Sequence, residues 1–263
     1  RKVVDTLADQ GADIPLNKEG ADTMLLTTVT ELRLFPTQLA ANAKILNKVG
    51  VNWTMFTDAF EAANLGYVAG DTKALHVATK RIVDKAKENG IKTVVVPETG
   101  HGYQVLRWLG PNTMGETLPF DVLSILEFIT QAQADGRLEL KKQANGSSVS
   151  YQDPCRLSRK GGILDVPRNI LKSMGYEVSE TESHGREDYC CGGGCGEYVL
   201  STGSRLRHKV FDLKRHQFED AGADKVMTAC ASCRYNLLIG AEKVEWDTPI
   251  TSLVETVAAH MAD

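Results

Sequence analysis

The sequence predicts an α/β protein built from two repeated halves, each with a small parallel sheet flanked by helices. Three observations favour this fold class. Short apolar runs of strand length alternate with segments of helical periodicity along the 263 residues. Similar segments recur after roughly 125 to 132 residues, which indicates an internal repeat. All cysteines lie in the second half of the chain, so only this half is expected to carry a thiol-based site.

Six apolar runs have the length and composition of buried strands. In chain order they are residues 24–29, 51–56, 93–96, 149–151, 176–178 and 225–228. Strands that alternate with helices form parallel sheets, because each connection crosses over through a helix. We therefore expect one parallel sheet in each half.

Three segments between these runs have the periodicity of amphipathic helices. The first two have their expected buried faces at Leu75, Ala78, Ile82 and Ala86, and at Val122, Ile125, Leu126 and Ile129. The third has its expected buried face at Leu206, Val210 and Leu213, away from Arg205, Arg207, Lys209 and Arg215.

The internal repeat divides the chain into two comparable halves. Ile45-Leu-Asn-Lys-Val-Gly50 corresponds to Ile170-Leu-Lys-Ser-Met-Gly175. In this register Glu98 and His101 take the positions of Cys230 and Cys233. We expect a cysteine-free α/β half at residues 23–146 and a cysteine-bearing α/β half at residues 147–263, after a polar segment at 1–22.

The composition is that of an ordinary globular protein. Apolar residues make up 42% and charged residues 24% of the chain, and no apolar stretch approaches the ~20 residues needed to span a bilayer. The formal net charge of −4 gives no reason to expect nucleic-acid binding. We expect no direct membrane insertion, so any attachment to a membrane must come through a partner.

Five of the six cysteines fall into one arrangement. Cys155 is followed after 34 residues by the pair Cys190-Cys191, and after 38 more by Cys230-Ala-Ser-Cys233. Thiolates are soft ligands that suit zinc and iron-sulfur centres, and Cys-x-x-Cys brings two sulfurs to one centre. Each group follows a predicted strand, and open α/β sheets bind ligands at the carboxyl ends of their strands. We therefore expect a metal site at this edge of the second half.

The adjacent pair Cys190-Cys191 needs an irregular backbone, because neighbouring side chains on a strand or helix point apart. The glycines at 192, 193, 194 and 196 supply that freedom. They also allow backbone N–H groups to approach sulfur, which stabilises negative charge. Cys195 lies in the same run. Its role is that of a spare ligand, a redox-active thiol or an inert small residue, and we favour the last.

Other interpretations of the cysteines remain open. Six cysteines in 263 residues are few for a disulfide scaffold. A structural zinc site needs four ligands, usually from two paired motifs, and would leave a fifth cysteine unused. Unmetallated reactive thiols are disfavoured, since clustered thiols in a reducing cytosol are normally metallated. A dinucleotide loop is disfavoured because the form G-x-G-x-x-G is absent.

The cysteine motifs resemble a known family. Asp153-Pro154-Cys155, Cys190-Cys191-Gly-Gly-Gly194 and Cys230-Ala-Ser-Cys233 are similar to the CCG domain of heterodisulfide-reductase-type (B/D-like) subunits, also present in iron-sulfur subunits of glycolate and lactate oxidation. Within that group the chain looks most like DsrK-type subunits of the membrane-bound Dsr complex, over essentially its whole length. The segments that carry this further resemblance are Gly11-Ala-Asp-Ile-Pro15, Lys18-Glu-Gly-Ala-Asp22, Asn52-Trp-Thr54, Phe60-Glu-Ala-Ala63, Gly100-His-Gly-Tyr103 and Leu106-Arg-Trp108.

The resemblance implies a non-cubane [4Fe-4S] cluster held by Cys155, Cys190, Cys191, Cys230 and Cys233, which are then both ligands and catalytic residues. It implies an oxidoreductase that reduces or forms a disulfide or trisulfide on a DsrC-like sulfur-carrier protein in dissimilatory sulfur metabolism. The segment 1–22 then connects to a ferredoxin-like module with cubane [4Fe-4S] clusters. The protein is expected in the cytoplasm, peripheral to the membrane and bound to quinone-reactive and other subunits.

Two competing functions remain open. One is an electron-transfer iron-sulfur subunit of a 2-hydroxyacid (glycolate or lactate) oxidase, and the other is a structural zinc-binding scaffold.

Residues around the motifs are less specific. Several basic residues lie near the ligands in sequence, namely Arg156, Arg159, Lys160, His184 and Arg186. They either make the surroundings of the site electropositive or are ordinary charges of solvated loops. His101 is a candidate catalytic proton donor or a structural histidine. Thr99 stands where several relatives have cysteine. Tyr103 and Trp108 are expected in the core.

Overall fold

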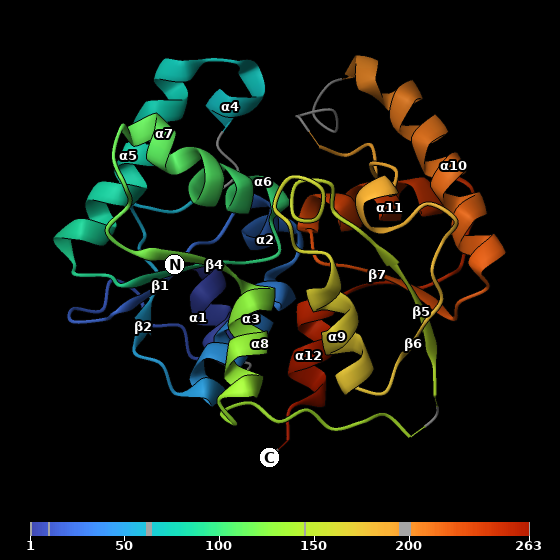
Figure 1. Ribbon diagram of the computed structural model, residues 1–263, viewed down its shortest axis with the longest axis horizontal. Helices are drawn as coiled ribbons and strands as arrows, with labels where there is room; N and C mark the ends of the chain where they lie inside the picture. The colour runs from blue at the N-terminus through green and yellow to red at the C-terminus, as the bar shows by residue number, and fades with distance from the viewer. Residues whose placement is uncertain (1, 10, 62–64, 145, 195–200, 263) are drawn as a thin grey trace. The chain divides into compact units, whose positions relative to one another are not determined.

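Figure 1 shows the computed structural model of the chain, which describes residues 2–9, 11–61, 65–144, 146–194 and 201–262. The chain divides into two compact units. Unit 1 is Arg1–Glu139 and unit 2 is Leu140–Asp263. Each unit has its own sheet and its own core.

Unit 1 begins with a helix and then alternates strands with helices. Its elements are α1 (Lys2–Asp9), β1 (Thr23–Leu25), α2 (Val29–Leu34), α3 (Pro36–Val49), β2 (Trp53–Thr54), α4 (Leu65–Ala69), α5 (Thr72–Glu88), β3 (Thr93–Val96), α6 (Gly100–Tyr103), the π-helical segment η1 (Gln104–Leu109), α7 (Gly110–Met114), β4 (Asp121–Ser124) and α8 (Ile125–Ala134).

The sheet of unit 1 has four parallel strands in the order β2-β1-β3-β4. Met24 and Leu25 of β1 and Val94 and Val95 of β3 are fully buried. Continuous apolar strands are typical of parallel sheets that are covered on both faces. Figure 1 shows that cover, with α1, α3 and α8 on one face and α5 with α7 on the other.

Unit 2 repeats the same alternation. Its elements are β5 (Ser148–Gln152), α9 (Asp165–Ser173), β6 (Glu177–Val178), the short 3₁₀ turns η2 (Gly185–Glu187) and η3 (Ser201–Gly203), α10 (Ser204–Ala221), β7 (Lys225–Thr228), α11 (Ala231–Lys243), β8 (Ile250–Ser252) and α12 (Leu253–His260).

The strand order of unit 2, β6-β5-β7-β8, is that of unit 1, and all pairs are again parallel. The chain passes from β5 to β6 on one side of it and then returns across β5 to β7 on the other side. Right-handed crossovers therefore place α9 on one face and α10 with α11 on the other, and α12, which follows the last strand, lies on the α9 side, as Figure 1 shows. The reversal creates a topological switch point between β5 and β7.

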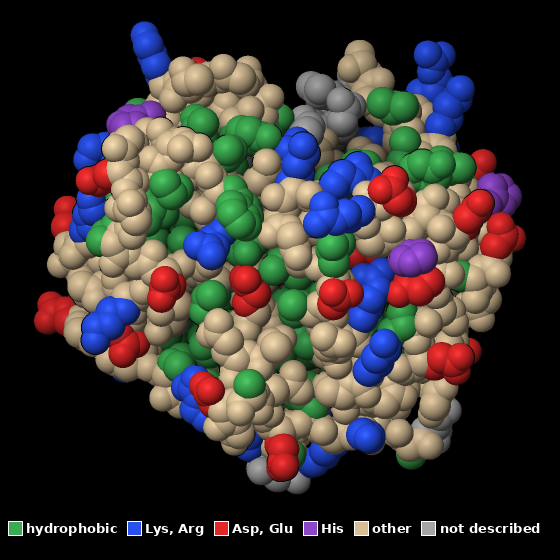
Figure 2. All heavy atoms as spheres, in the orientation of Figure 1, with side chains coloured by type: hydrophobic (Ala, Val, Ile, Leu, Met, Phe, Trp, Pro, Cys, Tyr) green, Lys and Arg blue, Asp and Glu red, His purple; other side chains and the backbone are tan. Residues whose placement is uncertain are grey.

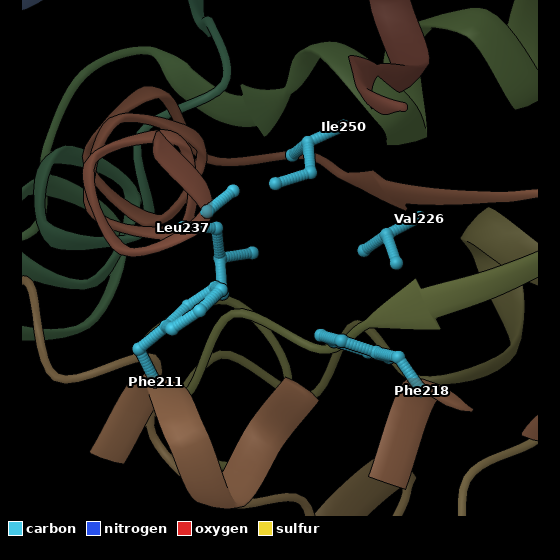
Figure 3. Packing of buried hydrophobic residues seen from close by; sticks show 6 residues of the cluster. Phe211, Phe218, Val226, Leu237 and Ile250 are labelled. Atoms are coloured by element: carbon cyan, nitrogen blue, oxygen red, sulfur yellow. The ribbon is translucent and has the colours of Figure 1, made fainter. Parts of the chain in front are cut away.

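The core of unit 2 on the α10 and α11 side is built around two phenylalanines. Phe211 and Phe218 of α10 pack with Val226 of β7, Leu237 of α11 and Ile250 of β8 (Figure 3). This cluster joins both helices to the two strands beneath them, and Ala241 and Trp246 extend it.

The predicted fold class is confirmed, since each unit has a parallel four-stranded sheet flanked by helices. The runs at 93–96 and 225–228 have the bounds of β3 and β7. Two edge strands, β4 and β8, were not predicted. The prediction that Val122 belongs to a helical face was wrong, because Val122 lies in β4 and the helix begins only after Ser124.

The expected buried face of the helix at 204–221 was also wrong. Leu206 and Leu213 are 57% and 47% exposed, whereas Phe211, Lys214 and Phe218 are buried. The two phenylalanines select the buried face because their rings fill the space above the sheet, which turns the leucines to solvent. Lys214 is carried into the interior with them.

Three further expectations concern unit 1. Tyr103 is buried as expected, but Trp108 is half exposed and was wrongly placed in the core. Within the segment 1–22, helix α1 buries Val4 and Leu7, and its role as a connector stays a prediction. Among the residues that the structure describes, no helix has both the length and the apolar character needed to cross a bilayer.

Candidate metal centre

The cysteine motifs lie in three loops beyond the carboxyl ends of strands in unit 2. Cys155 follows β5, Cys190 and Cys191 follow β6, and Cys230 and Cys233 follow β7. β5 and β7 are neighbours in the sheet although β6 lies between them in sequence. Two of the three loops therefore flank the switch point, where open α/β sheets bind ligands.

The structure brings the five cysteines into one group. The Sγ atoms of Cys191 and Cys233 lie 3.1 Å apart, and those of Cys155 and Cys190 lie 4.0 Å apart. Cys191, Cys230 and Cys233 form one buried cluster. Cys155 is half-buried and Cys190 is exposed, so the group has a buried side and an open side.

Helix α11 fixes the Cys230-Ala-Ser-Cys233 motif. Cys230 is the N-cap residue with extended backbone, and Cys233 lies in the first turn, so the spacing of one helical turn presents both thiols at the same helix end. The N–H groups of a first turn and the helix dipole favour negative charge at that end. Thiolates placed there are therefore stabilised.

Two glycines explain how adjacent cysteines share one site. Gly192 has φ +81°, in the left-handed region that favours glycine, and so turns the chain after Cys191. A Cβ on Gly193 would lie 2.5 Å from the Cβ of Asn236 and 2.9 Å from the carbonyl oxygen of Ser232, so only glycine allows this approach to α11.

The predicted approach of backbone N–H groups to sulfur is confirmed. The N–H groups of Gly192 and Gly193 lie 3.4 Å from the Sγ atoms of Cys190 and Cys191, respectively. Such donors stabilise a thiolate and tune the electronic properties of a metal bound to it.

The thiols change one another's ionisation. The hydrogen bond from the Cys155 thiol lowers the pKa of Cys190 to about 2, with further help from Cys191 and the Gly192 N–H. The same hydrogen bond, together with burial, raises the pKa of Cys155. Interaction with Cys190 raises the pKa of Cys191, and interaction with Cys191 raises that of Cys233. Negative charge is therefore favoured at Cys190, on the open side.

The described cysteines are free thiols rather than disulfides. The 3.1 Å between the Sγ atoms of Cys191 and Cys233 is far beyond the about 2.05 Å of a disulfide bond. Among the described side chains, no three histidines, cysteines, aspartates or glutamates are placed to hold a single metal ion.

Basic side chains lie beside the cysteine loops, and Figure 2 shows Lys and Arg gathered over the segment between β5 and α9. Arg159 uses its Nε and Nη2 atoms to bind the backbone carbonyls of Arg186 and Asp188. The charge of Arg156 contributes to the lowered pKa of Cys190. Arg156 and Arg159 therefore interact with the cysteine loops and are more than ordinary solvated loop charges.

Sequence reasoning missed three residues that support the site. Asp188 and Lys214 form a fully buried ion pair just before the cysteine pair. Asn236 of α11 donates from Nδ2 to the carbonyl oxygen of Cys191 at 2.6 Å. One signal could have found Lys214, since it is spaced three residues after Phe211 and four before Phe218, on their helical face.

The other candidates belong to unit 1 or lie outside the described residues. His101 is in α6 of unit 1, and its proposed catalytic role stays a prediction. Thr99 is the N-cap of α6 and accepts a hydrogen bond from the N–H of Gly102 at 3.3 Å, which gives it a structural role. Glu98, two residues beyond β3 as Cys230 is beyond β7, is buried. Cys195 lies outside the described residues.

Comparison with known proteins agrees with this geometry. Residues 149–238 match the cysteine-rich domain family named CCG, and this stretch contains all five grouped cysteines. The match lies within unit 2. It begins in β5 and ends in α11, so it includes all three cysteine loops.

The chain is similar to a heterodisulfide reductase subunit and to a quinone oxidoreductase. It is 28% identical over 225 residues to a component of the dihydromethanophenazine:CoB–CoM heterodisulfide reductase of Methanosarcina mazei, and this match covers 83% of this chain and 54% of that protein. It is 26% identical over 212 residues to the EtfAB:quinone oxidoreductase of Syntrophomonas wolfei, with 78% of this chain and 29% of that protein covered. The chain thus spans about half the length, or less, of these relatives.

The fold has a counterpart among solved structures. The crystal structure of a hypothetical protein from Helicobacter pylori covers 100% of this chain and 54% of its own, with a TM-score of 0.63 and 16% identity. At this identity the likeness concerns the fold alone, and it supports the α/β architecture. The comparisons thus show a CCG match within unit 2 and similarity of most of the chain to heterodisulfide reductase subunits.

Proposed function

We propose that this chain is the iron-sulfur subunit of an oxidoreductase that reduces or forms a disulfide or trisulfide. The proposed cofactor is a [4Fe-4S] cluster of the non-cubane type, held by Cys155, Cys190, Cys191, Cys230 and Cys233. The similarity to a component of a heterodisulfide reductase supports the reaction class. Zinc has no redox chemistry and would leave that reaction without an electron donor.

The observation that carries the proposal is the meeting of five thiols from three loops at one sheet edge. Three of them are buried together, and two sulfur pairs lie 3.1 Å and 4.0 Å apart. Five soft ligands exceed the four that a structural zinc site uses. A group of several irons accommodates all of them.

The protein's own residues hold, orient and shield this centre. Cys191, Cys230 and Cys233 form its buried side, where water is excluded and electrostatic interactions are strengthened. The N–H groups of Gly192 and Gly193 stabilise thiolate charge. When bound, the cluster supplies single-electron steps for cleavage of a sulfur-sulfur bond. The exposed Cys190 marks the side from which a sulfur-bearing substrate approaches.

The finer assignment is to the DsrK type. In that proposal the substrate is a DsrC-like sulfur-carrier protein, and the reaction belongs to dissimilatory sulfur metabolism. His101 donates a proton to the leaving thiolate, and further cubane [4Fe-4S] clusters in a ferredoxin-like module deliver electrons. The protein works in the cytoplasm, bound to the membrane through quinone-reactive subunits. The support for these details is the motif resemblance of the whole chain.

A second candidate function has a specific observation in its favour. Similarity to an EtfAB:quinone oxidoreductase supports an electron-transfer role in which the chain does not itself act on a disulfide. The glycolate or lactate oxidase component weighed from the sequence belongs to this class. Such a protein would bind the same cluster, so iron analysis alone does not separate the two functions.

The test of the cofactor is anaerobic purification with quantification of iron, acid-labile sulfide and zinc. We expect about four irons and little zinc, and an EPR signal of the oxidised protein that changes when a thiol is added. Stoichiometric zinc without iron would contradict the proposal. To separate the two functions, reduction of a carrier-protein disulfide by the purified complex is measured, and electron transfer without disulfide turnover would favour the second one.

Replacement of individual ligands tests the assignment residue by residue. Cys191→Ser and Cys230→Ser are each expected to lose most of the bound iron, because serine is a poor ligand for iron in a thiolate-bound cluster. Cys195→Ser serves as the matched control and is expected to retain it. Wild-type iron content in both of the first two variants would remove those residues from the ligand set.

A further inference from the structure

Two buried aspartates bind the loops that carry Cys155 and Cys190. Asp188 lies two residues before Cys190, and its Oδ2 accepts hydrogen bonds from the backbone N–H of Asp153 at 2.8 Å and from Gln152 Nε2 at 2.7 Å. Asp153, in turn, lies two residues before Cys155. The carboxylate of one loop is thus bonded to the backbone of the other.

The reverse contact is also present. Oδ2 of Asp153 accepts a hydrogen bond from the N–H of Gly185 at 2.7 Å, in the segment that leads to Asp188. Both aspartates are almost completely buried, at 1% and 2% exposure. Each therefore needs a compensating charge, because an unpaired carboxylate in the interior is strongly unfavourable.

The compensating charges come from helices on opposite faces of the sheet. Arg168 of α9 binds both oxygens of Asp153, at 3.0 Å and 2.7 Å, and also binds Glu180 at 2.6 Å and 2.9 Å. Burial opposes the charge of Arg168, but its hydrogen bonds to Asp153 and Glu180 raise its pKa. Lys214 of α10 is fully buried and pairs with Oδ1 of Asp188.

We propose that Asp153, Asp188, Arg168 and Lys214 form one buried charge network that sets the spacing of Cys155 and Cys190. These four are positioning residues, since they act on the thiols only through the backbone of two loops. Arg159 adds an outer contact, from the loop after Cys155 to the carbonyls of Arg186 and Asp188. The network explains why a buried lysine is present in a helix whose leucines are exposed.

The functional importance of this spacing rests on the proposed function, but the spacing itself is measurable without iron. In reduced, metal-free protein the oxidant diamide takes two electrons and two protons from a pair of thiols and joins them as a disulfide. The rate of the Cys155–Cys190 crosslink, mapped by peptide mass spectrometry, reports how well the pair is held. Positioned groups react far faster than unpositioned ones.

In the wild type, with its sulfur atoms 4.0 Å apart, we expect a rapid crosslink. Lys214→Met is expected to slow it by at least about tenfold, because the uncompensated Asp188 leaves its buried position and releases both loops. Lys87→Met is the matched control, since it removes a lysine that pairs with Glu116 on the surface of unit 1, and it should react at the wild-type rate.

Two further variants keep the proposal testable if Lys214→Met does not fold. Asp188→Leu/Lys214→Met removes both buried charges, which often preserves stability, but it also removes the acceptor for the Asp153 N–H. Arg159→Ala removes an exposed side chain and only the outer contact. Circular dichroism checks the fold of each. Slower crosslinking in the folded variants supports the network, and wild-type rates in all of them would overturn it.

The experiment separates the two proposals. If wild-type protein binds no iron while the crosslink still depends on Lys214, the cofactor assignment fails and the positioning role stands. If iron is bound normally but the crosslink does not depend on Lys214, only the network proposal fails.

Discussion

Glu31 is a buried carboxyl group with no role in the proposed site. It closes a capping box at the start of α2, where its Oε2 accepts from the Thr28 N–H at 3.1 Å and from Thr27 Oγ1 at 3.2 Å. Burial raises its pKa from 4.5 to about 8, and the nearby Glu98 adds to this effect. At neutral pH the folded protein therefore favours protonated Glu31.

This pKa predicts a pH dependence of stability. Between pH 4.5 and about 8 the unfolded chain has released the proton that folded Glu31 keeps, so the free energy of unfolding falls as the pH rises. The contribution is complete below pH 4.5 and is lost above the folded pKa. The slope approaches about 1.4 kcal/mol per pH unit within this window.

Glu31→Gln is expected to remove this slope, since glutamine does not titrate. The measurement is denaturant unfolding at several pH values across the window, with circular dichroism as the readout. The exposed Glu88 gives the control variant Glu88→Gln, which should retain the wild-type slope. An unchanged slope in Glu31→Gln would show that Glu31 ionises normally in the folded protein.

At the scale of elements, α10 and α11 pack closely because one residue lacks a side chain. A Cβ on Gly240 would lie 2.2 Å, 2.4 Å and 2.6 Å from three ring atoms of Phe211. The ring of Phe211 also meets that of Trp246 edge to face at a centroid distance of 6.0 Å. The aromatic core of unit 2 therefore depends on a glycine in the facing helix.

Gly240→Ala is expected to lower the free energy of unfolding by at least about 1–3 kcal/mol, through overpacking. Phe211→Ala alone is also destabilising, because it leaves a cavity. Alanine lacks the Cγ and Cδ atoms that meet position 240, so combining it with Gly240→Ala creates space for the new methyl group, and the double variant should lose less than the two single losses together. If the losses in free energy of unfolding of the two single variants simply add up in the double variant, as measured by denaturant unfolding, direct packing of these positions would be contradicted.

At the scale of the whole molecule, two sheets of the same strand order carry different chemistry. In unit 2 the loop after the third strand carries Cys230 and Cys233, and in unit 1 the corresponding loop carries Glu98 and His101. Both units also start their last helix in the same way. Ser124 and Ser252 are N-caps that accept from the backbone N–H groups of the residues three positions on.

Removal of iron is therefore expected to loosen unit 2 alone. Hydrogen exchange after anaerobic chelation should accelerate in the cysteine loops, at residues 153–160, 188–193 and 229–234, because the ligands no longer bind a common centre. The strands of unit 1 should keep their protection, since they have their own core. Equal loss of protection in both units would indicate that the cluster stabilises the chain as one cooperative body.

Local sequence patterns determined much of the fold. The strands β3 and β7 have the predicted bounds, because runs such as Thr93–Val96 leave little alternative to a buried strand. β4 and β8 escaped detection because each is short and leads directly into a helix. A signal was present, since Ser124-Ile-Leu-Glu127 and Ser252-Leu-Val-Glu255 both have the form of a capping box, which ends a strand and begins a helix.

The sequence by itself determined which residue types can form the site. Cys155, Cys190-Cys191 and Cys230-x-x-Cys233 identify thiolate chemistry wherever they lie in space. Only the tertiary structure decided how they meet, because the order β6-β5-β7-β8 places strands side by side that are distant in the chain. It also decided that Cys190 is exposed, and that Lys214 is buried against Asp188. The helical spacing of Lys214 could have indicated its burial, but its pairing with Asp188 depends on a contact between distant segments, which no local pattern records.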